Sequence, residues 1–377
     1  MRIAVNASSF HNRPPENDID FFSDYFFRFA SSHSKHIFIF IFNKPYDPTF
    51  KFPENVVPVV IGPEESSPIK WRFWYNLKIP AVLKKQRADI FVSEKFCSLK
   101  NKIPQLLISP DLTFIYQPSF VNIKHLSFYK KYTPRFLNTA NKIIVYSIFS
   151  KKELIKKYKI KEEKIQVIYH EINNDLKPLS LEERELTKEK YAEGNEYFIY
   201  RGTISPQENL MNLLKAFSFF KKRQKSKMQL IIAGIAGIQY EEFIQSLGLY
   251  RFNNEVKVLT NLSSKETQKI VASAYAMISV PLYDMSSVLA LESMKCDVPV
   301  ISAATGIFHE ICGDAALYVN PGNVKDIAEK MMLIFKDERM RKEFIEKGIT
   351  QVNQFQNIGN PTLIEVIESV VTKNPIS

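Results

Sequence analysis

Residues 283–300 read Tyr-Asp-Met-Ser-Ser-Val-Leu-Ala-Leu-Glu-Ser-Met-Lys-Cys-Asp-Val-Pro-Val. Within this stretch, 287–296 has the apolar spacing of an amphipathic helix. Short apolar runs, at 276–280 and 298–302, lie on either side of it and predict strands. A helix between two apolar strands is typical of a parallel sheet that is covered on both faces. The stretch therefore predicts one strand–helix–strand unit of an α/β fold.

The same alternation extends outward through the chain. In the second half, the predicted strands are 197–201, 228–233, 256–259, 276–280, 298–302 and 316–319. In the first half they are 2–7, 36–42, 56–61, 89–93, 105–109, 142–147 and 164–169. Amphipathic helical patterns separate these runs, so we expect two doubly wound parallel sheets.

The length of 377 residues and one break in the alternation predict two domains. At 173–190 the pattern lapses into Asn-Asn-Asp, a proline and a charged run, which predicts a linker. We expect Rossmann-like domains over 1–172 and 191–357 that face each other across a cleft, because such sheets bind ligands at the carboxyl ends of their strands.

The composition excludes several classes of protein. Only 11 residues are glycine, so the chain cannot carry many glycine-rich phosphate loops. Three cysteines without metal-ligand spacing argue against a disulfide framework or a zinc site. Every apolar run is shorter than the roughly 18 residues of a membrane span, and the run at 2–7 is too short for a signal peptide. We expect a soluble protein of a reducing compartment.

Positive charge is concentrated in one stretch. The net charge is +11, and residues 121–170 contain 12 Lys or Arg against three acidic residues. Such a stretch suits an anionic membrane surface or nucleic acid, and equally two solvated helix faces. No helix-turn-helix, zinc finger or aromatic RNA-binding motif accompanies it, so we expect no nucleic-acid partner. The solvated faces and the membrane surface stay open as alternatives.

Several segments resemble the retaining, nucleotide-sugar-dependent glycosyltransferases of family four (glycosyl transferases group 1), which have the GT-B fold. The family's signature is a Glu, seven residues, a second Glu, then Ala-Met and a Gly-x-Pro-Val strand start, and it corresponds to 284–300. Further similar segments are 111–114, 144–154, 200–217 and 306–322. The resemblance implies two Rossmann-like domains and a C-terminal helix, at 358–377, that returns to the first domain.

The resemblance also implies roles for individual residues. Glu292 would hold the ribose hydroxyls of a nucleotide-sugar donor, and Asp284 would approach the transferred sugar, because carboxylates accept hydrogen bonds from hydroxyls. Asp111 would be the catalytic residue of the first domain. The amides after two serines at a helix start would point at the diphosphate. The further donor-binding candidates are Arg201, Gly202, Thr203, Ser286, Ser287 and Val288.

The chain departs from the family pattern at several of these places. Glu208 stands where the family usually has a basic residue that neutralises the donor diphosphate, and a carboxylate there would repel phosphate. Pro110 replaces a histidine beside the reacting sugar, 285–287 replaces a Gly-Phe-Gly, and Asp284 replaces a glutamate. Arg201 would either contact the diphosphate as a substitute cation or pair with Glu208 or another carboxylate.

The leading interpretation is a glycosyltransferase that moves a hexose from a nucleoside diphosphate sugar to a saccharide or lipid-linked saccharide, with retention. No cofactor and no catalytic metal are expected, since the nucleotide sugar is a co-substrate. The alternative is a catalytically degenerate GT-B protein that acts as a binding or partner subunit. We expect a role in polysaccharide biosynthesis and a cytoplasmic location, either free or peripheral at the inner face of the membrane.

Overall fold

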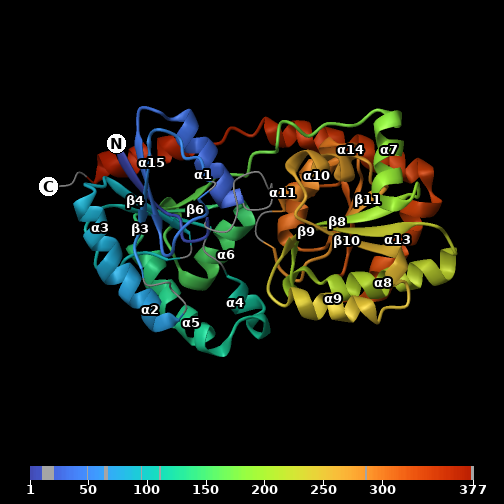
Figure 1. Cartoon of the computed structure of the whole chain (residues 1–377), viewed down its shortest axis with the longest axis horizontal. Coiled ribbons are helices and arrows are strands. Elements are labelled where there is room, and N and C mark those ends of the chain that lie inside the picture. Colours follow the sequence, from blue (N-terminus) through green and yellow to red (C-terminus); the bar gives the residue numbers. More distant parts are fainter. Residues whose placement is uncertain are drawn as a thin grey trace. The chain divides into compact units, whose positions relative to one another are not determined.

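The computed structural model describes residues 1–10, 21–48, 50–62, 67–94, 96–109, 112–284 and 287–374. The chain folds into two compact units (Figure 1). Unit 1 comprises Met1–Tyr169 together with Asn360–Ser377, and unit 2 comprises His170–Gly359. Each unit is built on one parallel sheet with helices on its faces, so the α/β class predicted from the sequence is confirmed.

The sheet of unit 1 has seven strands in the order β3-β2-β1-β4-β5-β6-β7. The strands are β1 (Arg2–Asn6), β2 (Ile37–Phe42), β3 (Val56–Val60), β4 (Ile90–Glu94), β5 (Gln105–Ile108), β6 (Lys142–Val145) and β7 (Ile165–Val167). The helices are α1 (Phe21–Ser32), α2 (Pro68–Phe73), the π-helical η1 (Trp74–Lys78), α3 (Ile79–Lys85), α4 (Thr113–Tyr116), α5 (Ile123–Thr139), α6 (Ile148–Tyr158) and α15 (Leu363–Lys373). The 3-10 turns are η2 (Pro118–Phe120) and η3 (Glu162–Lys164).

Aromatic side chains fill the core of unit 1. Strand β2 reads Ile-Phe-Ile-Phe-Ile-Phe and is buried from Phe38 onward, as a strand covered on both faces should be. The ring of Phe40 lies 5.5 Å from Phe10 and 5.5 Å from Phe27. Two residues of α15, Val366 and Ile367, belong to the same core. The C-terminal helix is therefore part of unit 1.

The sheet of unit 2 has six strands in the order β10-β9-β8-β11-β12-β13. The strands are β8 (Tyr197–Ile204), β9 (Gln229–Ala236), β10 (Val256–Thr260), β11 (Ala276–Ser279), β12 (Val300–Ala303) and β13 (Ala316–Val319). The helices are α7 (Leu181–Ala192), α8 (Leu210–Gln224), α9 (Tyr240–Gly248), α10 (Ser264–Ala272), α11 (Val288–Lys295), α12 (Gly306–Cys312), α13 (Val324–Lys336) and α14 (Glu338–Gln356). The 3-10 turns are η4 (Pro206–Glu208) and η5 (Asn253–Glu255).

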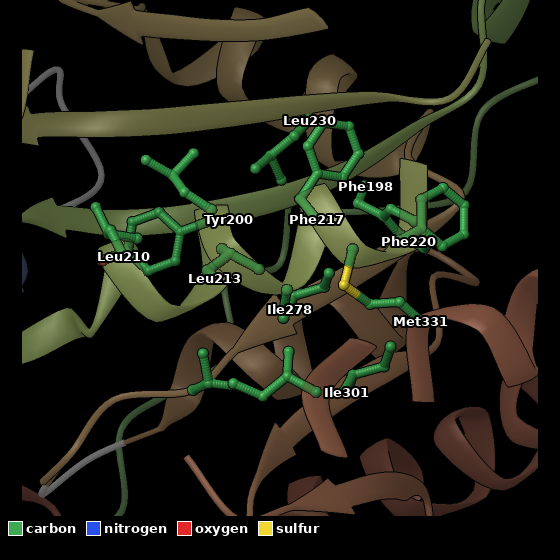
Figure 2. Packing of buried hydrophobic residues seen from close by; sticks show 14 of the residues in the cluster. Phe198, Tyr200, Leu210, Leu213, Phe217, Phe220, Leu230, Ile278, Ile301 and Met331 are labelled. Carbon is green, nitrogen blue, oxygen red and sulfur yellow. The ribbon is translucent and has the colours of Figure 1, made fainter. Parts of the chain in front are cut away.

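The core of unit 2 joins α8 and α13 to one face of its sheet (Figure 2). Phe217 and Phe220 of α8 point toward Phe198 of β8, and the rings of Phe198 and Phe220 are 5.2 Å apart, edge to face. Met331 of α13 and Ile278 of β11 belong to the same cluster. Packing α8 in this way fixes where the β8–α8 loop lies, and that loop carries Glu208.

The segment predicted as a linker, 173–190, includes a helix in its second half. Residues from Leu181 onward form α7, which belongs to unit 2. Its start is a capping box, in which Ser180 and Glu183 bond each other's backbone amides. The charged composition concealed this helix because only a few of its residues, such as Thr187 and Ala192, are buried. The short helix α12 was also missed.

Candidate functional site

Several predicted site residues of unit 2 lie on the elements next to the switch point of its sheet, where the strand order reverses between β8 and β11. Strand β8 pairs with β9 on one side and with β11 on the other, so the chain winds away from β8 in both directions. Parallel α/β sheets bind ligands outside such a switch point, at the carboxyl ends of the strands. Residues Arg201, Gly202 and Thr203 lie toward the carboxyl end of β8, and α11 follows β11 and carries Val288 and Glu292.

Arg201 and Glu292 form a buried ion pair. Nη1 of Arg201 donates to Oε2 of Glu292 at 2.5 Å, and the two side chains are 2% and 3% exposed. Of the two expectations for Arg201, the structure shows a pairing with a carboxylate, that of Glu292. Burying either charge alone would cost roughly several kcal/mol. Each side chain therefore stabilises the other in its buried position.

Two loops place Glu208 close to Asp284. The buried Asn209 donates from Nδ2 to the carbonyl of Val280 at 2.9 Å and to that of Pro321 at 2.7 Å. The amide of Leu282 donates to the carbonyl of Gln207 at 3.1 Å. These bonds tie the β8–α8 loop to the loop after β11, and this brings the two carboxylates near one another.

The neighbourhood of Glu208 favours its neutral form. Burial and the negative charge of Asp284 raise the pKa of Glu208 to about 8, although a hydrogen bond with Tyr200 partly opposes the shift. Burial, with Glu208 and Asp284 nearby, likewise raises the pKa of Tyr200 well above its ordinary value. A raised pKa favours the protonated form of Glu208 and so lessens the repulsion that a carboxylate there would exert on phosphate.

Ser287 does not cap α11 in the expected way. It is the N-cap residue, but its φ of 50° is left-handed and its side chain makes no capping hydrogen bond. Its hydroxyl instead donates to Oδ2 of Asp284 at 2.6 Å. Ser287 thus positions the carboxylate of Asp284, while Val288 begins the helix as a buried residue.

Close backbone packing surrounds Gly202. A Cβ on Gly234 of β9 would lie 1.8 Å from the Gly202 carbonyl oxygen, and a Cβ on Gly202 would lie 2.6 Å from the Tyr200 hydroxyl. That hydroxyl donates to the carbonyl of Thr203 at 2.8 Å. Only glycine therefore fits at 202 and 234, and Tyr200 holds the end of β8 in one conformation.

Some expected residues cannot be placed. Asp111 and Ser286, with their neighbours Pro110 and Met285, lie outside the described residues. In the part of the chain that the structure describes, no group of three or more His, Cys, Asp or Glu residues is arranged to hold a metal ion.

Sequence reasoning missed two residues of this region, Tyr200 and Asn209. Tyr200 looked like an ordinary strand residue, and its position one step before Arg201 gave no signal that its hydroxyl faces Glu208. Asn209 stands directly after Glu208, and its left-handed φ of 62° is a conformation that asparagine tolerates well. An asparagine between a proline turn and a helix start was the available signal for it.

Two Rossmann-like units, one of which gathers carboxylates and an arginine at its switch point, define the GT-B class of proteins. The same class emerges from comparison with known families. Residues 182–351 match the model described as glycosyl transferases group 1, and residues 33–176 match the model described as glycosyltransferase family 4. The chain belongs to the group 1 glycosyltransferases.

The chain is similar to several known proteins at low sequence identity. It is 23% identical over 246 residues to the Escherichia coli protein named O-antigen chain mannosyltransferase B, a match that covers 65% of each sequence. The chain therefore spans just under two thirds of that relative's length.

Solved structures are similar over nearly the whole chain. Sucrose-phosphate synthase from Thermosynechococcus elongatus has a TM-score of 0.75 at 15% identity, over 99% of this chain and 97% of that one. HepE of Anabaena, in complex with UDP-glucose, has a TM-score of 0.70 at 14% identity, over 99% of both chains. At such identities the likeness shows the fold alone.

Crossing a bilayer demands a helix of about 20 mostly apolar residues. Within the described ranges, no helix is both long enough and apolar enough to do so.

Proposed function

We propose that the chain transfers a hexose from a nucleoside diphosphate sugar to a saccharide or lipid-linked saccharide, with retention of configuration. The observation that carries this proposal is the buried Arg201–Glu292 pair next to the switch point of unit 2, with Asp284 held by Ser287 in the loop after β11. The mannosyltransferase relative and the UDP-glucose complex of HepE support it. We further propose a role in polysaccharide biosynthesis and a cytoplasmic location.

In this proposal Glu292 accepts hydrogen bonds from the ribose hydroxyls. Arg201 donates to Oε2, so Arg201 fixes the carboxylate while the lone pairs that the ion pair leaves unused accept from the diol. Asp284, oriented by Ser287, faces the transferred sugar. The amides at the start of α11 and the helix dipole favour the diphosphate there, which stabilises the charge that develops as it departs.

Glu208 is proposed to act as a neutral hydrogen-bond donor. Since its pKa is raised to about 8, the protonated carboxyl presents an O–H to a phosphate oxygen at neutral pH. This would replace the basic residue that related enzymes usually have. We propose that Asp111 assists on the acceptor side and that the reaction needs neither a cofactor nor a catalytic metal.

The alternative is a degenerate GT-B protein that binds a saccharide or a partner without transferring sugar. The observation in its favour is that Arg201 is engaged by Glu292, so this cation neutralises a carboxylate of the protein before any phosphate arrives. Turnover separates the two functions. Hydrolysis or transfer from a panel of UDP- and GDP-sugars, followed by mass spectrometry with saccharide acceptors, would establish the enzyme.

Calorimetric titration with UDP and GDP tests the donor site directly. We expect wild type to bind at least one of them, and Glu292→Gln to lose about 1.5–3 kcal/mol of binding free energy, as for a hydrogen bond to a charged group. Glu329→Gln on α13 is the matched control, because this exposed glutamate lies in the same unit, and it should bind like wild type.

Glu208→Lys should tighten binding, because it places a cation near the diphosphate. Absence of nucleotide binding by both wild type and Glu208→Lys would contradict the donor site. Binding without turnover of any donor would favour the degenerate protein.

A further inference from the structure

Asn209 stands at the start of α8 and does not cap it. It follows the 3-10 turn η4 and is the N-cap residue of α8, yet its side chain makes no capping hydrogen bond. An asparagine at an N-cap ordinarily accepts a hydrogen bond from an amide of the first helical turn. Asn209 is only 7% exposed, so its polar atoms need partners elsewhere in the fold.

The side-chain amide of Asn209 joins three loops of unit 2. Its Nδ2 donates to the carbonyl of Val280 at 2.9 Å and to that of Pro321 at 2.7 Å. Val280 is the first residue after β11, and Pro321 is the second residue after β13. Asn209 itself lies in the connection between β8 and α8. One side chain therefore links the carboxyl ends of β8, β11 and β13.

The backbone of Asn209 narrows the choice of residue at this position. Its φ of 62° and ψ of 27° are left-handed, a conformation that asparagine and glycine adopt more readily than other residues. Glycine would adopt this conformation but would lose the two hydrogen bonds. Aspartate would keep the size of the side chain but would present oxygens, not hydrogens, to two carbonyls. Asparagine supplies both the backbone conformation and the two donated hydrogens.

The loop that carries Pro321 is itself held in place. The side chain of Asn320 accepts a hydrogen bond from the amide of Gly322 at 2.9 Å. The amide of Asn320 donates to Oδ2 of Asp326, on α13, at 2.7 Å. Since α13 and α8 belong to the same core, Pro321 is a fixed point against which Asn209 positions the β8–α8 loop.

The bonds of Asn209 lie at the base of the two loops that carry Glu208 and Asp284. Glu208 directly precedes Asn209, and Asp284 lies four residues after Val280. Asp284 is held in turn by the hydroxyl of Ser287 at 2.6 Å. Asn209 therefore occupies the place of a residue that sets how far apart the two carboxyl groups lie.

The titration of Glu208 reports that separation. After burial, the negative charge of Asp284 is the main cause of the raised pKa of Glu208, and a hydrogen bond with Tyr200 opposes it. Tyr200 belongs to β8, the strand that leads into the same loop as Glu208, whereas Asp284 lies in the loop after β11. The effect of Asp284 on Glu208 thus acts from one loop to the other, and it weakens as the distance between them grows.

We propose that Asn209 is a positioning residue of the donor site, which holds Glu208 and Asp284 at a fixed separation before a donor binds. Groups that are already in place spend no free energy on rearrangement when a ligand arrives. The inference rests on the proposed function in naming a donor, but the separation can be measured without any nucleotide. If Asn209 served stability alone, its loss would leave the interaction between the two carboxyl groups unchanged.

Carbon-13 NMR of the full-length protein, labelled at its glutamate carboxyl carbons, tests the proposal. The signal of Glu208 is identified by its absence from Glu208→Gln. Asp284→Asn should lower the pKa of Glu208 by about 1 in an otherwise wild-type chain, because a nearby negative charge is removed. In an Asn209→Gly background, the same substitution should lower it by less than about half as much. An equal effect in the two backgrounds, or no effect in the first, would overturn the proposal.

Asn261→Gly is the matched control for Asn209→Gly. Asn261 also has a left-handed backbone in unit 2, with a φ of 59°, but it is exposed and follows β10. Both variants keep a residue that adopts this conformation, so they differ in the side-chain bonds alone. Asn261→Gly should leave the effect of Asp284→Asn on Glu208 as large as in the wild-type chain, and thermal unfolding would establish that each variant folds.

Asn209→Asp provides a second variant in case Asn209→Gly does not fold. It keeps the size and the backbone preference of asparagine but has no hydrogen to donate when ionised. The charge that it adds affects both members of the Asp284→Asn comparison alike, so the difference between them still reports the separation. We expect this difference to shrink as in Asn209→Gly, and an undiminished difference would contradict the proposal.

Calorimetric titration with UDP and GDP separates this inference from the proposed function. Asn209→Gly should weaken nucleotide binding about tenfold, as expected when roughly one hydrogen bond to the diphosphate is misplaced, and Asn261→Gly should not. If wild type bound neither nucleotide while the NMR result was as expected, the positioning role would stand and the proposed donor site would be wrong. If nucleotide bound but Asn209→Gly left the interaction of the carboxyl groups intact, the positioning role would be wrong and the donor site would stand.

Discussion

The two units have the same topology at their switch points but different chemistry. In unit 2 the switch point between β8 and β11 is surrounded by ionisable groups, namely Arg201, Glu208, Asp284 and Glu292. In unit 1 the described residues at the corresponding point between β1 and β4 include buried neutral polar groups beside Glu94, the last residue of β4. There the buried Asn6 donates to the hydroxyl of Tyr75 at 2.7 Å and to that of Ser93 at 3.2 Å.

The contrast teaches that topology sets where a ligand binds, while side chains set which ligand. Buried charges cost free energy to retain, so a fold keeps them where a charged ligand or a partner charge repays the desolvation. Neutral amides and hydroxyls match the hydroxyls of a sugar instead. Three experiments would break or sharpen this contrast, and we give them in order of decreasing expected effect.

The largest effect is expected at the buried ion pair. Arg201→Ala and Glu292→Ala should each lower the free energy of unfolding by about 3–5 kcal/mol, because each leaves an uncompensated buried charge. Arg201→Met combined with Glu292→Leu should lose much less, since both charges are gone. Urea denaturation followed by far-UV circular dichroism would measure all three variants. Losses below about 1 kcal/mol in the single variants would show that the pair is not buried in solution.

The same experiment reports on the two units separately. Both tryptophans, Trp71 and Trp74, lie in unit 1, so their fluorescence follows unit 1 while circular dichroism follows the whole chain. A fluorescence transition that stays in place while the dichroism transition shifts would assign the loss to unit 2.

An intermediate effect is expected from the titration of Glu208. Its pKa rises from an ordinary 4.5 to about 8 on folding, so the folded state favours the protonated form. The free energy of unfolding should therefore fall as pH rises from about 4.5 to about 8, by on the order of 2 kcal/mol for this partly exposed group. Glu208→Gln should match wild type near pH 4.5 and exceed it near pH 8.5.

Denaturation at these two pH values would measure the difference, with Glu329→Gln as the control that should follow wild type throughout. A Glu208→Gln variant that is no more stable than wild type at the higher pH would contradict the raised pKa.

The smallest effect is expected at the switch point of unit 1. Asn6→Ala should lower the free energy of unfolding by about 1–2 kcal/mol, because Tyr75 and Ser93 each lose a buried hydrogen-bond partner. Since no charge is removed, the loss should be the same at pH 5 and pH 8. Asn138→Ala, an exposed position of the same unit, serves as the control. A loss as large as that of Glu292→Ala would erase the distinction between the two switch points.

The sequence predicted the strands well because their signal is local. All 13 strands of the structure overlap runs that continuous apolar residues indicated, and the elements fold into two parallel sheets as expected. A strand buried on both faces must be apolar throughout, so its own residues reveal it. Helix α7 was not predicted, because few of its residues are buried and its charged composition resembles that of a linker.

The site was predicted as a set of residues but not as a set of contacts. The resemblance singled out Asp284 and Glu292, and a departure from it singled out Arg201, yet Arg201 and Glu292 are 91 positions apart in the chain. Whether Arg201 faces a phosphate, Glu208 or Glu292 depends on how β8 and α11 pack, and the identity of the residue carries no information about that.

The charge of Glu208 was likewise decided by the tertiary structure alone. A carboxyl has an ordinary pKa unless its surroundings change it, and these surroundings are Tyr200, the loop held by Asn209 and the carboxylate of Asp284. The sequence determined which residue types are present and which runs form strands, because those follow from local periodicity. Only the packed structure decided which groups are buried together, and desolvation and Coulomb energies depend on that distance.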